Sequence, residues 1–146
     1  MKLDPRNDGI DHINVYSKGK TEIGRWLSNF TYAPITTEDG KFNSIEGYWY
    51  WLSTKDDSLR KLSGFAAKKK GRELKGEDWL TSKDFKHKIR KAIHNKLCSY
   101  PNMMDIFLKT ELPIVHYYVF KDKVVVPKEG KWLMDFLEEY RESAIE

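Results

Sequence analysis

Apolar residues recur along much of the chain with the spacing of helices. After Ser44, the residues Ile45, Tyr48, Trp49 and Leu52 fall at i, i+3, i+4 and i+7, which predicts a capped helix with one buried face. Similar apolar stripes predict four further helices. The first runs from Leu59 to about Lys70 and is closed by Gly71, and the second begins after Trp79 and ends at Leu97. The third is Asn102–Lys109, which follows Pro101, and the last has its stripe at Trp132–Tyr140.

Shorter runs with alternating or β-branched residues predict a few strands. They lie at Ile13–Ser17 and at Val115–Phe120 and Val124–Val126, the last two on either side of a Lys121–Lys123 turn. A turn signal at Glu38–Lys41 predicts a hairpin, and Trp26–Pro34 is mixed enough to be extended or irregular. We therefore expect an α+β fold, a mostly helical single domain over residues 1–146 with a small antiparallel sheet.

Composition limits the class of protein. A chain of 146 residues that is 40% hydrophobic and 14% aromatic can bury a core without disulfides, and Cys98 is its single cysteine. No stretch approaches the roughly 20 apolar residues that span a bilayer, and the first residues carry no apolar signal core. We expect a cytoplasmic protein without a membrane partner.

Positive charge is concentrated in the middle of the chain. The formal net charge is +4, yet residues 60–97 alone hold 13 Lys and Arg against 4 Asp and Glu, a net +9. Such a block favours anionic partners, either phosphate-bearing small molecules or nucleic acid. A solvated helix face is the alternative explanation.

The most unusual cluster lies in the first turns of the central predicted helix. Glu46 has Trp49 and Tyr50 at i+3 and i+4, with Tyr48 and Trp51 nearby. A carboxylate walled by rings loses water, which raises its pKa, and rings stack on flat bases. These groups suit cleavage of an N-glycosidic bond, in which a carboxylate stabilises a cationic sugar and holds the attacking water. Alternatively, Glu46 is a capping-box residue favoured by the helix dipole.

Two weaker clusters could serve a ribose or a phosphate. Ser28, Asn29 and Phe30 follow Leu27 in a predicted loop, where the polar pair either holds a turn or faces a sugar. Lys69 and Arg72 belong to the run Ala67–Arg72, which either offsets a helix dipole or grips phosphate, with Arg72 the better bidentate donor. The spacing of the four histidines forms no metal motif, so we expect neither a metal nor a cofactor.

In order and spacing, these segments together resemble the NADAR family, also called YbiA-like. The resemblance covers roughly residues 13 to 141. It rests on the segments Ile13–Ser17, Leu27–Phe30 with Pro34, Asp39–Phe42, Ser44–Glu46 with Tyr48, Ala67–Arg72, Trp79, Ile89–Lys96 and Leu108–Thr110.

The resemblance implies an α+β, largely helical fold and N-glycosidase activity. Family substrates are ribosylamino-pyrimidine phosphates of early riboflavin synthesis or ADP-ribose adducts of guanine in nucleic acid. By position, Glu46 would be the catalytic carboxylate, Ser28 and Asn29 would contact sugar or phosphate, and Arg72 with Lys69 would serve the anionic part. Phe30, Tyr48 and Trp49 complete the expected substrate-binding set, with Tyr48 or Trp49 stacking on the base.

The chain also departs from the family pattern. Gly47 stands where the family commonly has His, and Leu52 and Ser53 stand where it has Gln and Lys. A Gly-rich Trp-Gly segment near the C-terminus is replaced by His116–Phe120 and Lys123–Pro127. The first hypothesis is a divergent N-glycosidase that prefers an ADP-ribose adduct, and the second is a non-catalytic module that binds ADP-ribose, NAD or nucleic acid.

Overall fold

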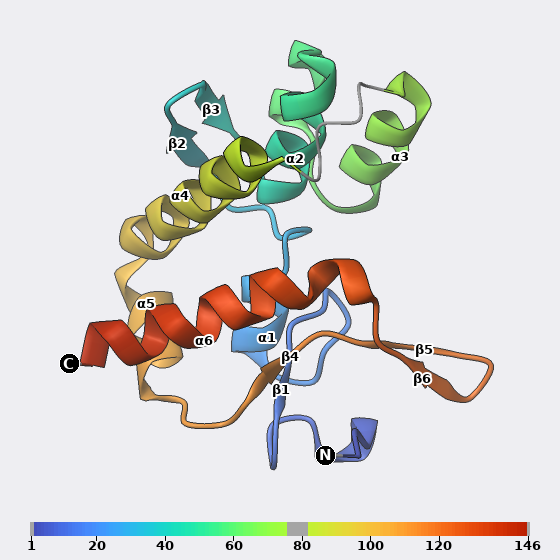
Figure 1. Cartoon of the computed structure of the whole chain (residues 1–146), viewed down its shortest axis with the longest axis vertical. Coiled ribbons are helices and arrows are strands. Elements are labelled where there is room, and N and C mark those ends of the chain that lie inside the picture. The colour runs from blue at the N-terminus through green and yellow to red at the C-terminus, as the bar shows by residue number, and fades with distance from the viewer. Residues whose placement is uncertain (1, 76–81, 146) are drawn as a thin grey trace. The chain divides into compact units, whose positions relative to one another are not determined.

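A computed structural model of the chain describes residues 2–75 and 82–145 (Figure 1). Helices dominate, and the strands form three separate two-stranded pairs. The α+β, mostly helical expectation is therefore confirmed, although the strands do not join into one sheet and one pair is parallel. The chain divides into two compact units, residues 29–101 and residues 1–28 with 102–146, which are described separately. The prediction of a single domain stays a prediction.

In the unit 29–101, a hairpin leads into the central helix. Strands β2 (Ile35–Thr37) and β3 (Gly40–Phe42) pair antiparallel, as the turn signal predicts, and Gly40 has the positive φ of 106° that this turn needs. Helix α2 (Ile45–Thr54) follows, with Ile45, Tyr48 and Leu52 buried.

Three further helices lie in the described part of this unit. They are the 3-10 helix η2 (Asp57–Lys61), α3 (Gly64–Leu74) and α4 (Lys83–Ser99). The stripe Phe85, Ile89, Ala92, Ile93 and Leu97 of α4 is buried, as its spacing predicts. The expected helix from Leu59 to Lys70 is in fact η2 and α3. Gly71 does not end it but lies inside α3, for a packing reason given below. Trp79 lies outside the described residues.

The other unit joins the two ends of the chain. Strand β1 (Ile13–Asn14) pairs in parallel with β4 (Ile114–Val115). Helix α5 (Pro101–Lys109) follows α4 in the sequence, and helix α6 (Lys131–Ile145) is the last helix of the chain. Helix α1 (Glu22–Leu27) is capped by the Thr21 side chain, so the start of the segment expected to be irregular is helical. A further hairpin consists of β5 (Tyr118–Phe120) and β6 (Lys123–Val125).

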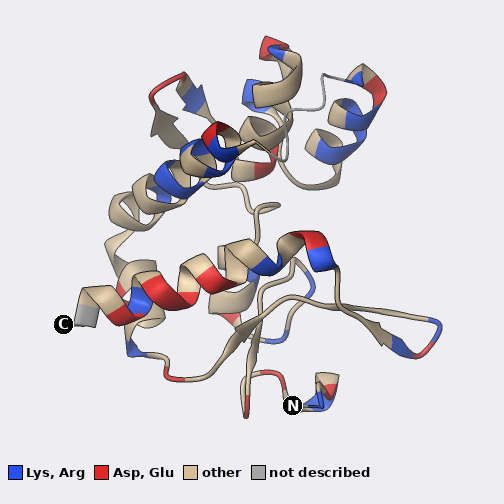
Figure 2. Ribbon diagram, viewed as in Figure 1, with Lys and Arg blue, Asp and Glu red and all other residues tan. Residues whose placement is uncertain are grey.

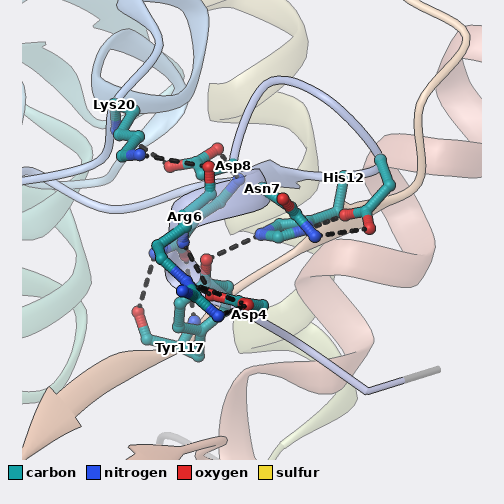
Figure 3. A network of polar contacts seen from close by, with 9 residues as sticks. Asp4, Arg6, Asn7, Asp8, His12, Lys20 and Tyr117 are labelled. Atoms are coloured by element: carbon teal, nitrogen blue, oxygen red, sulfur yellow. Dashed lines mark hydrogen bonds and ion pairs between the residues drawn. The ribbon is translucent and has the colours of Figure 1, made fainter.

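A buried polar network fixes the parallel pair (Figure 3). The Asn14 side chain donates to the Tyr117 carbonyl at 3.1 Å and accepts from the Tyr117 N–H at 3.0 Å. The His12 ring lies between a carboxylate and a phenol, with Asp11 at 2.5 Å from Nδ1 and the Tyr117 hydroxyl at 2.6 Å from Nε2. Because the Asp11 carboxylate can only accept, Nδ1 donates to it. Burial raises the pKa of Tyr117 to about 12.

Candidate functional site

Glu46 is the second residue of helix α2. The Ser44 hydroxyl caps the helix by accepting from the Gly47 N–H at 3.0 Å, and it donates to the Leu62 carbonyl at 2.9 Å. Gly47 thus occupies the third helical position, where a capping-box carboxylate would stand. The structural explanation of Glu46 as a capping-box residue is therefore wrong.

Asn29 and Phe30 hold the starts of two helices through their backbone carbonyls. The Asn29 carbonyl accepts from the Glu46 N–H at 2.9 Å, and the Phe30 carbonyl accepts from the Gly64 N–H at 2.9 Å. These bonds satisfy N–H groups that a helix leaves unpaired in its first turn. These two residues therefore fix the position of the first turns of α2 and α3, and with them the position of Glu46.

The Glu46 carboxyl has a perturbed protonation equilibrium. Burial raises its pKa to about 7, because the ionised form loses hydration, while the positive charges of Lys68 and Arg72 act in the opposite direction. Both cations belong to α3 and lie four residues apart, on one face of that helix. Glu46 is thus a carboxyl poised to exchange a proton near neutral pH, with two cations close by.

Tyr50 links the carboxyl to the cations. Its ring packs on the backbone of Gly71, so closely that a Cβ at this glycine would lie 2.1 Å from the Tyr50 Cγ. Burial and the charge of Glu46 raise the pKa of the Tyr50 hydroxyl, and a hydrogen bond from Arg72 partly offsets this. Within residues 29–101, Glu46, Tyr50, Lys68 and Arg72 therefore form one cluster, which we call the α2–α3 cluster.

Two of the aromatic residues expected to stack on a base lie elsewhere. Tyr48 is fully buried, its ring 4.7 Å from that of Phe42, and its hydroxyl donates to Asp39 at 2.6 Å. It offers no free ring face to a substrate. Trp49 is half-buried and its ring meets Phe85 of α4 edge-on at 4.7 Å.

The remaining expected residues divide between the cluster and other places. Arg72 belongs to the cluster, and Phe30 lies beside it, since the Lys68 ammonium is 5.8 Å from the Phe30 ring centroid. Lys69 is exposed, and it is Lys68 whose charge acts on Glu46. Ser28 is buried at the end of α1, in the other unit.

Sequence reasoning missed Tyr50 and Lys68 as site residues. The signal was present in the spacing, because Tyr50 is at i+4 from Glu46 and Lys68 at i−4 from Arg72. Only the packing of α2 on α3 distinguishes Lys68 from Lys69.

Lys and Arg residues are frequent along α3 and α4, as the blue segments of these helices show (Figure 2). Several of those on α4 have partners within the same unit: Lys88 reaches Asp39 at 3.3 Å and Lys91 reaches Glu38 at 3.8 Å. Lys96 is buried, and desolvation lowers its pKa to about 7. The Lys and Arg residues of this block therefore do not form one continuous exposed surface, because some are ion-paired and one is buried.

Gly47 has a steric reason to replace a larger residue. A Cβ there would lie 2.6 Å from the Leu59 carbonyl oxygen and 3.2 Å from that of Leu62. The backbone around η2 thus occupies the space that a side chain at this position would need. Leu52, where the family pattern has a polar residue, is buried in the core.

The described residues, 2–75 and 82–145, contain neither a candidate metal-ligand group nor a candidate membrane span. Within these ranges, no three His, Cys, Asp or Glu side chains group as metal ligands. No described helix has both the length and the apolar composition needed to cross a bilayer.

These features define the chain as an α+β protein with a half-buried carboxyl of raised pKa at the start of α2 and the Lys- and Arg-rich helix α3 packed against α2. Among solved structures, the NMR structure of the E. coli protein YbiA has the same fold, with a TM-score of 0.69, 21% identity, and coverage of 98% of this chain and 94% of that one. No protein-family model matches the sequence. No curated protein matches it either.

Proposed function

We propose that the protein is an N-glycosidase that hydrolyses the N-ribosyl bond of a phosphate-bearing substrate. The observation that carries the proposal is the α2–α3 cluster, in which a carboxyl with a pKa of about 7 lies near Lys68 and Arg72. The favoured substrate is an ADP-ribose adduct of guanine in nucleic acid, and the second is a ribosylamino-pyrimidine phosphate. The YbiA-like fold supports the choice of reaction class, because the family resemblance implies this activity.

The chemistry assigns one role to each member of the cluster. Glu46 holds water against C1′ of the ribose and stabilises the positive charge that develops there as the bond to the base breaks. Water then adds to C1′ and passes one proton to the carboxylate, and the carboxyl returns this proton to the departing base, so that Glu46 ends in its starting form. Lys68 and Arg72 bind phosphate oxygens, and the Arg72 guanidinium suits a bidentate contact. The Tyr50 hydroxyl orients Arg72.

A second candidate function is binding without turnover. The buried, apolar Leu52 and the tightly packed Gly47 favour it, because both stand where the family pattern has polar groups. A binding module would use the same two cations for phosphate and would leave Glu46 with no chemical step.

Turnover by wild type and by Glu46→Gln separates the two. Each protein is offered ADP-ribosylated guanine in DNA, ADP-ribose, NAD and the ribosylamino-pyrimidine phosphates, and released base and sugar are read by mass. We expect release by wild type and a loss of at least about 100-fold in the variant. Glu73→Gln removes an exposed carboxylate of α3 and serves as the matched control.

Each other outcome has a defined meaning. If neither protein releases base, yet one ligand raises the melting temperature of both, the binding module replaces the glycosidase. If the variant and wild type release base at the same rate, Glu46 is not the catalytic carboxylate.

A further inference from the structure

The hairpin β5–β6 is built as a separate ribbon. Tyr118 pairs with Val125, Val119 with Val124 and Phe120 with Lys123, which leaves Lys121 and Asp122 as a two-residue turn. Both turn residues have positive φ, 50° and 63°, as a type I′ turn requires. In Figure 1 the ribbon extends away from the β1–β4 pair of its own unit.

Apolar side chains on this hairpin are exposed to an unusual degree. Val119 is 51% exposed, Phe120 60% and Val126 56%, while Tyr118 and Val124 are each 36% exposed. A two-stranded hairpin in water is marginally stable by itself. A cluster of exposed apolar residues of this kind marks an interaction surface.

The pairing determines which side chains share a face. Directly paired residues of an antiparallel ribbon lie on the same face, and faces alternate along each strand. Tyr118, Phe120, Lys123 and Val125 therefore lie on one face, and Val119 with Val124 on the other. Both faces carry exposed apolar groups.

The outer edge of β5 has a single residue with free backbone groups at its centre. The turn is closed by a bond between the Phe120 carbonyl and the Lys123 N–H, so Phe120 points its backbone groups toward β6. Since this direction alternates along a strand, the N–H and C=O of Val119 point outward. On the next outward-pointing residue, Tyr117, both groups are already bonded to Asn14.

We propose that a second copy of this chain binds at this edge, with β5 pairing antiparallel to β5 of the other copy about a two-fold axis at Val119. In this register each Val119 exchanges two backbone hydrogen bonds with its counterpart. Val124, Val119 and their two counterparts then form a continuous row of four valines on one face. On the other face, Tyr118 lies opposite the second copy's Phe120, a favourable aromatic pair.

Charge and polarity favour a second copy over other occupants. Lys121 and Lys123 lie at the turn, so the two-fold axis places the lysines of the two copies at opposite ends of the four-stranded sheet. Insertion into a lipid surface would drive the charged turn into the apolar layer first. A nucleic acid stacked on Tyr118 and Phe120 would leave the valine face in water. The shared surface is small, so we expect association in the range of about 10–500 µM.

A charge-swap experiment tests the two-fold axis at Val119. Sedimentation velocity over this concentration range should show wild type shifting from monomer to dimer. Val119→Lys and Val119→Glu should each stay monomeric, because like charges then face each other directly across the axis. Their equimolar mixture should dimerise at least about 10-fold more tightly than either variant alone. Val126→Lys adds the same charge away from the pairing register and should weaken the dimer less.

A crosslink provides an independent measurement. Hydrogen-bonded antiparallel partners have Cα atoms about 5.5 Å apart, within the range for a disulfide. In a Cys98→Ser background, Val119→Cys should oxidise to a covalent dimer, whereas Lys123→Cys should not. A wild type that stays monomeric at every concentration overturns the proposal, as does a dimer that neither swap nor crosslink affects. A monomer whose hairpin binds an oligonucleotide, with binding lost in Phe120→Ser, would assign the surface to nucleic acid instead.

Discussion

The ring of Tyr50 packs directly on the backbone of Gly71, and this contact joins the helix that carries Glu46 to the helix that carries Arg72. An exposed helical Gly→Ala change stabilises by about 1 kcal/mol. Here we expect Gly71→Ala to destabilise by about 1–3 kcal/mol, because the added methyl overlaps the ring. Urea unfolding followed by circular dichroism measures the change.

A double-mutant cycle isolates the cause. In a Tyr50→Ala background the overlap is gone, so Gly71→Ala should regain the ordinary stabilising effect of alanine in a helix. Additive effects of the two substitutions would show that the glycine is needed for another reason.

The sequence predicts best those features that depend on neighbouring residues. Spacing alone gives the helix behind Ser44 and the hairpin at Glu38–Lys41, because a cap, a stripe and a turn are local. The prediction that Gly71 ends a helix is wrong, because the glycine is required by the Tyr50 ring of another helix and the neighbouring residues do not indicate this contact. Lys68 was missed in favour of Lys69 because neighbours in sequence differ by about 100° around a helix.

Long-range pairing is the other part that the sequence does not determine. The apolar run Val115–Phe120 is predicted as one strand, yet the chain changes partners at His116 and Tyr117, with β4 on β1 and β5 on β6. The change is stabilised by Asn14, whose side chain bonds both backbone groups of Tyr117. A buried Asn in a short strand does not by itself reveal which distant residue it will meet.

Tyr48→Phe should affect stability and leave catalysis unchanged. The Tyr48 hydroxyl donates to Asp39, and together with Lys88 it holds the Asp39 pKa below its usual value despite burial. Loss of this bond should cost about 1–2 kcal/mol, measured by urea unfolding. A stacking role for Tyr48 would give a different result. Tyr48→Phe would then retain the ring and the normal KM, while Tyr48→Ala would raise KM without a matching loss of stability.

Lys68 and its neighbour Lys69 form a matched pair for testing whether the α2–α3 cluster binds phosphate. We expect Lys68→Gln to raise KM for a phosphate-bearing substrate by about 3–10-fold at low salt and to flatten its salt dependence. Lys69→Gln should have less than about a 2-fold effect, because Lys69 is exposed and does not act on Glu46. Removal of Lys68 should also raise the Glu46 pKa, which would shift the acidic limb of the pH–rate profile toward higher pH. Equal effects of the two substitutions would indicate that the general positive charge of α3 attracts phosphate, and not a specific contact from Lys68.

The titration of Glu46 should be visible in folding stability without any substrate. Burial raises its pKa from 4.5 to about 7, so between these values the folded chain holds a proton that the unfolded chain has lost. Stability should therefore fall as pH rises through this window, by up to about 3 kcal/mol from this group alone. Glu46→Gln cannot ionise, so it should gain stability relative to wild type between pH 5 and pH 8.

Urea unfolding of both proteins at pH 5 and pH 8 measures this difference, and Glu73→Gln controls for the loss of an exposed carboxylate. In the control, the stability difference from wild type should be the same at both pH values. If the Glu46→Gln difference is equally constant, the carboxyl is ionised across the whole range. Such a carboxylate could still stabilise a cationic sugar, but it would be a weaker general base for water than a carboxyl with a pKa near 7. The pH dependence of stability thus tests the acid–base role of Glu46 independently of the substrate.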